Sequence, residues 1–145
     1  MYERPYWLWK PFKGSLLIVY LGNFAGAVLI AFLVAHSGQY DYSAGALGAY
    51  TIKTAVGKTG LSFMRALFSG ILCNILVCAA VLMAAAAKDI GGKVLAIFFP
   101  ILAFVVSGFE HCVANMYYIP AGIFAAGNPA YVQKAQELYG WEQKN

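Results

Sequence analysis

The sequence predicts an all-α integral membrane protein, and two observations carry that prediction. Of the 145 residues, 61% are hydrophobic and only 11% are charged, with a mean hydropathy of +0.67, whereas soluble domains are roughly 45–50% apolar and about 25% charged. The apolar residues also gather in runs of about membrane length. Because a soluble chain this short leaves much of its surface in water, the composition excludes a soluble enzyme, a disordered tail and a disulfide-stapled secreted module.

The first apolar run predicts a membrane span over residues 14–38. Residues 14–40 carry no formal charge. As a helix, the central residues 16–36 would be about 31 Å long, close to the thickness of the hydrocarbon layer. The following residues, 37–60, are polar, contain five glycines and include no apolar run that could cross a bilayer. They are expected to form an extramembrane connection.

The second span is predicted over residues 61–87. It is uncharged from Ala66 onwards and ends in the helix-favouring run Met-Ala-Ala-Ala-Ala. Residues 88–93, Lys-Asp-Ile-Gly-Gly-Lys, are expected to form a tight turn in which Gly91 and Gly92 let the chain reverse.

The third apolar region, residues 94–126, is predicted to be a broken membrane helix. Its first half, residues 94–106, is too short to cross a bilayer alone, and Ser107-Gly108-Phe109-Glu110-His111 separates it from a second apolar half at residues 112–126. Non-helical backbone at membrane depth is tolerated only where protein buries it or where it lines a cavity. Residues 127–145 form a polar tail, expected to be interfacial or soluble, and residues 1–145 are expected to be one partial membrane domain.

Basic residues indicate the orientation of these spans in a cell membrane. Lys and Arg concentrate on the cytoplasmic side of membrane proteins. They flank the first span at Arg4, Lys10 and Lys13 and occupy the 88–93 turn at Lys88 and Lys93. The N-terminal flank and the turn are therefore expected to be cytoplasmic, although the opposite side also carries basic residues, at positions 53, 58 and 65.

Glu110 and His111 are the residues most able to carry chemistry. Ionisable residues at membrane depth are costly and usually mark a pathway or a proton relay. The alternative is a wet helix end at the interface, but the apolar residues that follow favour burial. Asn74, in the middle of the second span, either joins helices or lines a pore, and Asn115 adds a second amide near the break.

Other functional classes lack the residues that they need. The three cysteines lie in apolar segments without metal-ligand spacing, so free buried thiols are expected. The sequence shows no phosphate loop, no nucleophile–base pair and no metal cluster, and its scattered basic residues do not suit nucleic acid. We expect no metal and no other cofactor, no nucleic-acid partner, and a conduit rather than an enzyme.

Three stretches of the sequence resemble the formate/nitrite transporter family. The most specific is Ser-Gly-Phe-Glu-His-Cys-Val-Ala-Asn-Met at residues 107–116, followed by Pro120. Residues 19–26 and 70–78 resemble the third and fourth helices of the family. The resemblance implies an aquaporin-like bundle of six helices in two inverted repeats, assembled as a pentamer with one pore per protomer. It also implies transport of small monovalent anions or their neutral acids, in the class of formate, nitrite or hydrosulfide.

The resemblance also implies roles for individual residues. His111 resembles the central pore histidine, through which transport would be coupled to protons, Phe104 the aromatic constriction, and Lys58 the vestibule lysine. The polar residues around that lysine and the break are matched by Asn74, Glu110 and Asn115.

The sequence departs from the family pattern in one respect, because it holds three membrane elements where the family has six. Three elements cannot enclose such a pore. The missing helices are therefore expected to come from other polypeptide, in a homo-oligomer surrounded by lipid. The alternative is a fragment, or a scaffold subunit of a membrane complex, that does not transport.

Overall fold

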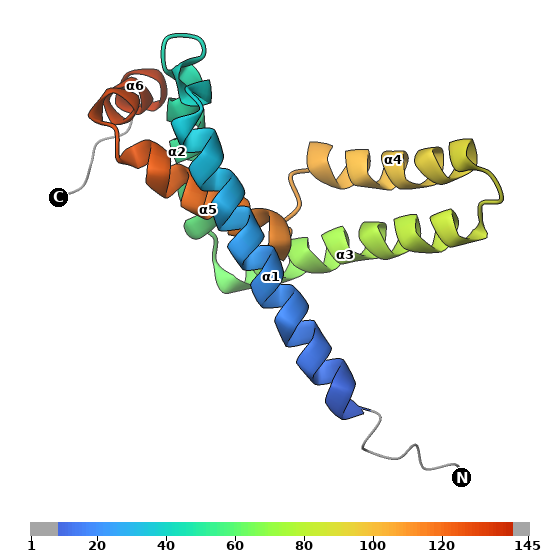
Figure 1. The fold of residues 1–145 in the computed structure, drawn as a ribbon. Coiled ribbons are helices and arrows are strands. Elements are labelled where there is room, and N and C mark those ends of the chain that lie inside the picture. The colour runs from blue at the N-terminus through green and yellow to red at the C-terminus, as the bar shows by residue number, and fades with distance from the viewer. Residues whose placement is uncertain (1–8, 141–145) are drawn as a thin grey trace. The chain divides into compact units, whose positions relative to one another are not determined.

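The computed structural model describes residues 9–140 and is helical throughout (Figure 1). The elements in chain order are α1 (Trp9–His36), the 3-10 turn η2 (Gln39–Asp41), α2 (Ala46–Thr59), α3 (Phe63–Ala86), α4 (Ile90–Val106), α5 (Cys112–Ala126) and α6 (Pro129–Tyr139). No strand occurs among residues 9–140. The all-α prediction is confirmed. Residues 1–8 and 141–145 lie outside the described part, and so do the side chains of residues 9–13. The basic N-terminal flank and the end of the polar tail therefore fall outside it.

Two of these helices are long and apolar enough to cross a membrane. They are residues Gly14–His36 of α1 and the whole of α3, Phe63–Ala86. Helices α4 and α5 have 17 and 15 residues and so measure about 26 and 22 Å. Each is shorter than the hydrocarbon layer of about 30 Å, and the non-helical residues 107–111 separate them.

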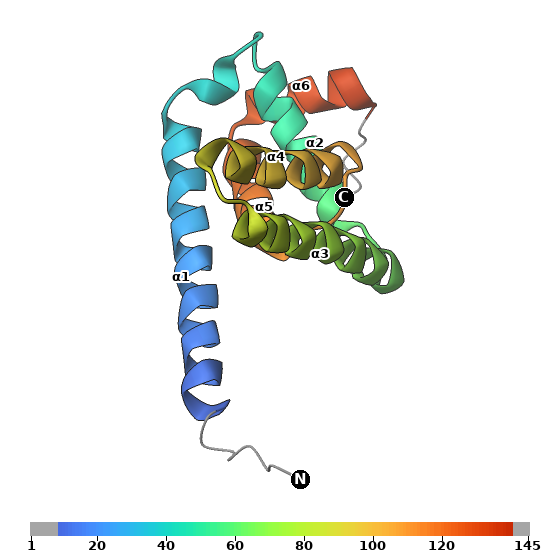
Figure 2. The ribbon, with the colours of Figure 1, turned by 90° about the vertical axis from the view of Figure 1, so that its right-hand side faces the viewer.

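The described residues group into two compact units. The hairpin unit is residues Gly57–Asn115, and the connector unit combines the described parts of Met1–Val56 and Met116–Asn145. In the hairpin unit, α3 and α4 lie side by side and run antiparallel (Figures 1 and 2). The expectation of one membrane domain with spans at 14–38, 61–87 and 94–126 stays a prediction.

The turn between α3 and α4 is shorter than residues 88–93. Helix α4 begins at Ile90, and its N-cap Asp89 accepts a hydrogen bond from the Gly92 N–H at 2.8 Å. Gly91 and Gly92 therefore lie inside the first helical turn, and the expectation that they reverse the chain is wrong. A Cβ added to Gly92 would lie 3.0 Å from an Asp89 carboxylate oxygen, so this glycine leaves room for the carboxylate that caps the helix.

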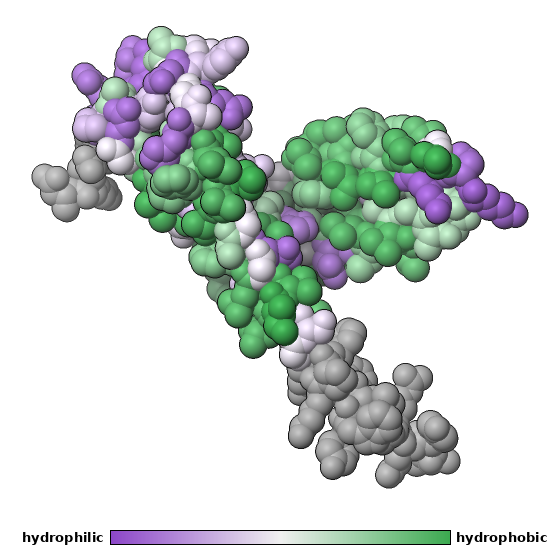
Figure 3. All heavy atoms as spheres, in the orientation of Figure 1, coloured by the Kyte–Doolittle hydropathy of each residue, from purple (hydrophilic) through white to green (hydrophobic). Residues whose placement is uncertain are grey.

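The outer surface of the α3–α4 hairpin is strongly hydrophobic. Figure 3 shows apolar residues over both helices and polar ones at the turn that joins them. Large apolar side chains such as Leu82 and Val106 are 71% and 78% exposed in the isolated chain. A soluble monomer rarely exposes a contiguous apolar surface of this extent, so lipid or further protein must cover the hairpin.

The connector unit contains most of a helix that the sequence did not predict, α2, whose residues 57–59 belong to the hairpin unit. Helix α2 lies inside the expected connection and has 14 residues, about 21 Å, too short to cross a bilayer. Its sequence holds two glycines and three threonines, which are weak helix formers. Tertiary packing compensates for this, because Ile52 joins Tyr40 and Ala125 in a buried cluster. Burial raises the pKa of Tyr40 to about 12, so its phenol is neutral at physiological pH.

Candidate functional site

The candidate site lies within the hairpin unit, at the break between α4 and α5. Helix α4 ends in a Schellman motif. The N–H of Phe109 donates to the carbonyl of Phe104, and the N–H of Gly108 donates to the carbonyl of Val105, both at 3.1 Å. Gly108 has a φ of +68°, the left-handed conformation that this motif requires and that glycine adopts without a steric penalty.

Substituting Gly108 by alanine is expected to destabilise the break by about 1 kcal/mol, because a Cβ disfavours the left-handed conformation. Steric crowding would not contribute to this destabilisation, since a Cβ at this position would meet no atom within 4 Å. The measurement is the thermal transition of the purified assembly. Gly14→Ala is the matched control, because Gly14 lies in α1, has equally open surroundings and lacks a positive φ. A Gly108→Ala protein as stable as the control would contradict the expectation.

Helix α5 begins immediately after His111, which caps it with both side chain and backbone. The ring nitrogen Nδ1 accepts a hydrogen bond from the Ala114 N–H at 3.2 Å, and the His111 carbonyl accepts from the Asn115 N–H at 2.9 Å. Because Nδ1 is the acceptor, the hydrogen-bond network assigns the hydrogen of the neutral ring to Nε2. The ring of Phe104 stacks on His111 with centroids 5.7 Å apart. This arrangement leaves Nε2–H as the donor that His111 offers to another molecule.

Glu110 connects three parts of the hairpin unit. Its backbone N–H donates to Ser69 Oγ on α3 at 2.8 Å. Its carboxylate accepts from Lys58 Nζ at 2.7 Å and from Asn115 Nδ2 at 2.8 Å, one on each oxygen. The side chains of Lys58 and Glu110 are only 17% and 12% exposed. The two bonds to the carboxylate are charge-assisted and therefore stronger than neutral ones, and they bind the break to the last turn of α2 and to α5. The neutral bond to Ser69 binds it to α3.

Among the described residues of this cluster, Asn115 carries the one buried polar side-chain atom that lacks a hydrogen-bond partner. Its Nδ2 is committed to Glu110, because a carboxylate can only accept. Its Oδ1 is buried and has no hydrogen-bond partner among the described residues. An unsatisfied buried acceptor costs about 1–3 kcal/mol, so Asn115 Oδ1 is a place where a donor from outside these residues would be stabilised.

The structure brings together most of the candidate residues. Lys58, Glu110 and Asn115 form one cluster, and Phe104 contacts His111. Asn74 is not part of this cluster. It is exposed on α3, and no hydrogen bond of its side chain to another described residue is seen. The pathway roles of all six residues stay predictions.

Sequence reasoning missed Ser69, which accepts the hydrogen bond from the Glu110 backbone. A signal was present, because Ser69-Gly70 is a pair of small residues, one of them a hydroxyl donor and acceptor, in a mostly apolar span. The backbone of α3 approaches the break there: a Cβ on Gly70 would lie 3.9 Å from the carbonyl oxygen of Glu110.

Comparison with known proteins gives concordant results. The family model for the formate/nitrite transporter matches residues 1–142. A formate channel, FocA, of Haemophilus influenzae is 46% identical over 110 residues, which cover 76% of this chain and 39% of the relative. The uncharacterized transporter YrhG of Bacillus subtilis is 46% identical over 114 residues, covering 74% of this chain and 40% of the relative.

A solved structure described as a pentameric formate channel with formate bound is similar in fold. Its TM-score is 0.78 at 33% identity, and the match covers 88% of this chain and 54% of that one. The chain thus spans about two fifths of the length of the curated relatives and about half of this structure. The predicted resemblance to the family is confirmed, and the chain belongs to the formate/nitrite transporter family, which comprises membrane transporters and not enzymes.

Proposed function

We propose that this chain forms part of a channel for small monovalent anions or their neutral acids, in the class of formate, nitrite or hydrosulfide. The observation that carries the proposal is the polar cluster of Lys58, Glu110 and Asn115 beside His111, at a break between two half-length apolar helices. Relatives named as formate channels, and the likeness to a pentameric formate channel with formate bound, support this class of permeant.

His111 is the centre of the proposed mechanism. Its Nε2–H offers a hydrogen bond where the anion leaves water, and Phe104 on the ring face makes the passage apolar. A bare charge is very costly in such surroundings, so hydrated ions are excluded and a hydrogen-bonded or protonated anion is favoured. If the proton travels with the anion, transport is coupled to the pH gradient.

Lys58 acts at short range in this scheme. Its ammonium is paired with the Glu110 carboxylate at 2.7 Å, so the two charges largely cancel at a distance. The pair sets the net charge of the cluster at zero. Losing Lys58 would leave a carboxylate that repels anions.

Further polypeptide completes the pore. Three apolar elements leave the non-helical residues 107–111 without enough walls to exclude lipid, and each unsatisfied backbone group in hydrocarbon costs several kcal/mol. We assign the remaining wall to polypeptide outside these 145 residues, in a homo-oligomer that is fivefold and embedded in lipid. The N-terminal flank and residues 88–93 are cytoplasmic in this arrangement, following the positive-inside rule.

Flux of formate into liposomes tests the proposal, and Lys58→Ala is the decisive variant. It is expected to lower flux most at low substrate and low ionic strength, because a charge acts over a Debye length of only about 8 Å at physiological salt. The double variant Lys58→Gln, Glu110→Gln is the matched control, since it keeps the net charge at zero. It should retain more low-substrate flux than Lys58→Ala.

Two results would contradict this scheme. An equal loss of flux at low and saturating formate would show that Lys58 does not act on the anion through its charge. Absence of flux in the assembled wild-type protein would favour a scaffold that does not transport.

A further inference from the structure

The backbone N–H of Glu110 ties the break to a neighbouring helix. The three preceding N–H groups, of residues 107–109, donate to carbonyls within α4 at 3.0 or 3.1 Å. Glu110 N–H donates instead to Ser69 Oγ on α3 at 2.8 Å. An N–H group without an acceptor is costly at membrane depth. The Ser69 hydroxyl therefore satisfies the backbone at the point where the end of α4 no longer does.

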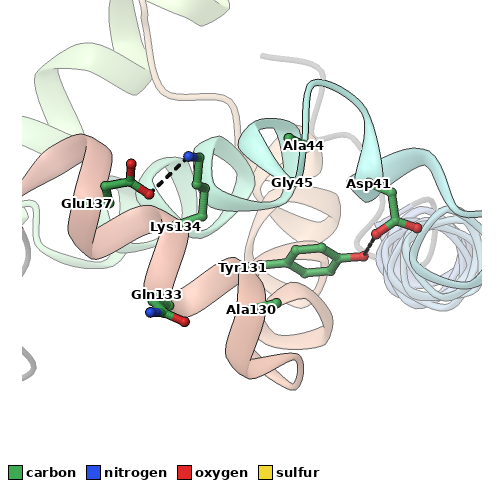
Figure 4. Close-up of a pocket in the computed structure, with 8 residues that line it drawn as sticks. All are labelled: Asp41, Ala44, Gly45, Ala130, Tyr131, Gln133, Lys134 and Glu137. Atoms are coloured by element: carbon green, nitrogen blue, oxygen red, sulfur yellow. Dashed lines mark hydrogen bonds and ion pairs between the residues drawn. The ribbon is translucent and has the colours of Figure 1, made fainter.

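The bond that Ser69 makes differs from those of other hydroxyls in the described residues. Thr51 and Thr54 on α2 donate to the carbonyl four residues earlier in their own helix, each at 2.9 Å, a common arrangement for helical hydroxyls. Tyr131 donates to the Asp41 carboxylate (Figure 4). Ser69 accepts, and no hydrogen bond from its hydroxyl to α3 is seen among the described residues. Its Oγ thus serves the break rather than its own helix.

The residue that follows Ser69 lets α3 approach the same peptide. A Cβ placed on Gly70 would lie 3.9 Å from the Glu110 carbonyl oxygen, the distance of an ordinary van der Waals contact. Both residues are partly buried, and a hydrogen bond is stronger where water is partly excluded. Ser69 and Gly70 together form a seat on α3 that receives the Glu110 backbone.

The position of Glu110 matters because the polar cluster is built on it. Its carboxylate accepts from Lys58 Nζ and Asn115 Nδ2, and the next residue, His111, starts α5. All of these residues, like Ser69, belong to the hairpin unit. A rotation of the Glu110 peptide would therefore displace its carboxylate and the His111 ring together.

We propose that Ser69 is a positioning residue that holds the break against α3 and so sets where the Glu110 carboxylate and the His111 ring lie. Ser69 acts through the Glu110 backbone and has no assigned contact with the permeant. The inference rests on the proposed function only for the consequence on flux. Its physical content is one hydrogen bond, from Glu110 N–H to Ser69 Oγ, whose loss lets the break move.

The first experiment tests this bond by hydrogen exchange of single amides in the assembled protein. Ser69→Thr and Ser69→Val introduce side chains of nearly the same shape, but only threonine keeps an oxygen that can accept. The Glu110 amide should exchange about tenfold faster in Ser69→Val than in Ser69→Thr. The Phe109 amide, which bonds within α4, should exchange equally in both.

Two alanine variants complete this experiment. Ser69→Ala removes the acceptor without adding a branched side chain, so it provides a second route if Ser69→Val does not fold. It should also exchange the Glu110 amide about tenfold faster than the wild type does. Ser62→Ala is the matched control, because Ser62 precedes the same helix and its side chain makes no capping hydrogen bond. Ser62→Ala should leave the exchange of Glu110 unchanged.

The second experiment tests positioning by acetylation of lysine amines, read by peptide mass spectrometry. Lys58 should react slowly in the wild type and faster in Glu110→Gln, where its carboxylate partner is gone. Ser69→Val should move the Lys58 rate toward that of Glu110→Gln, and Ser69→Thr should keep it near the wild-type rate. The exposed Lys88 should react at a constant rate in all four proteins.

Flux into liposomes then tests the consequence for transport. Ser69→Val should lower formate flux per assembled protein about tenfold relative to Ser69→Thr, and should add little to His111→Phe. The two effects overlap because Ser69 acts on the donor that His111→Phe already removes. A purely structural defect would instead lower flux by the same factor in either background.

Each outcome separates the seat from the proposed function. Equal exchange of the Glu110 amide in the threonine and valine variants would overturn the tether. Faster exchange in Ser69→Val with an unchanged Lys58 acetylation rate would overturn the positioning role. If wild-type flux is absent, the proposed function fails, while the exchange and acetylation results still decide whether Ser69 holds the break.

Discussion

Replacing His111 by phenylalanine is expected to lower anion flux about 10- to 150-fold, without preventing membrane insertion. The range follows from losing one hydrogen bond to a charged group, worth about 1.5–3 kcal/mol. His111 is the donor in question because Nδ1 is committed to the Ala114 N–H and only Nε2–H remains. The measurement is formate flux into liposomes over a range of pH.

Two further variants separate the roles of His111. His111→Asn keeps an oxygen that can cap α5 but cannot titrate, so it should preserve assembly and remove the pH dependence of flux. His36→Phe changes the other histidine, which lies at the end of α1 and bonds its own helix at the Phe32 carbonyl, and should leave flux intact. Unchanged, pH-dependent flux in His111→Phe would show that another group serves the permeant.

Replacing Glu110 by glutamine is expected to destabilise the hairpin unit by about 2–3 kcal/mol. The change leaves the largely buried Lys58 ammonium without its carboxylate, and breaking a buried pair by removing one partner is strongly destabilising. The thermal transition of the solubilised assembly measures the effect.

The chain offers a matched control for this substitution. Glu137 pairs with Lys134 at 3.0 Å, but its side chain is 65% exposed. Exposed pairs of this kind contribute about 0–1 kcal/mol, so Glu137→Gln should barely move the transition. Equal effects of the two substitutions would show that the Lys58–Glu110 pair is no stronger than a surface pair.

The break was the most predictable part of the molecule. A glycine followed by two ionisable residues between apolar halves leaves few alternatives in a membrane, and the structure places Gly108 at the helix end and His111 at the next helix start. The periodicity of the sequence could not predict that Lys58 pairs with Glu110, because 52 positions separate them. The family resemblance alone suggested that they belong to one site.

Other features escaped prediction for identifiable physical reasons. Helix α2 has weak local propensity and exists through packing, as its buried Ala49 and Ala55 show. The Ser69 contact is made to backbone, which leaves no charge or spacing signal in the sequence. Glycine commonly marks turns, so the sequence favours a loop at Gly92, whereas in the structure Gly92 accommodates a capping carboxylate.

The manner in which the broken helix is terminated has an entropic consequence. Helix α4 closes its end with its own backbone around Gly108, and α5 is capped by its own neighbour His111. Both closures are thus made by groups of the chain itself. The conformational entropy of residues 107–111 is therefore lost when the chain folds rather than when a permeant arrives. A preorganised passage binds each arriving molecule without an ordering step and releases it without a disordering one. In the proposed channel, this property would favour rapid, repeated passage.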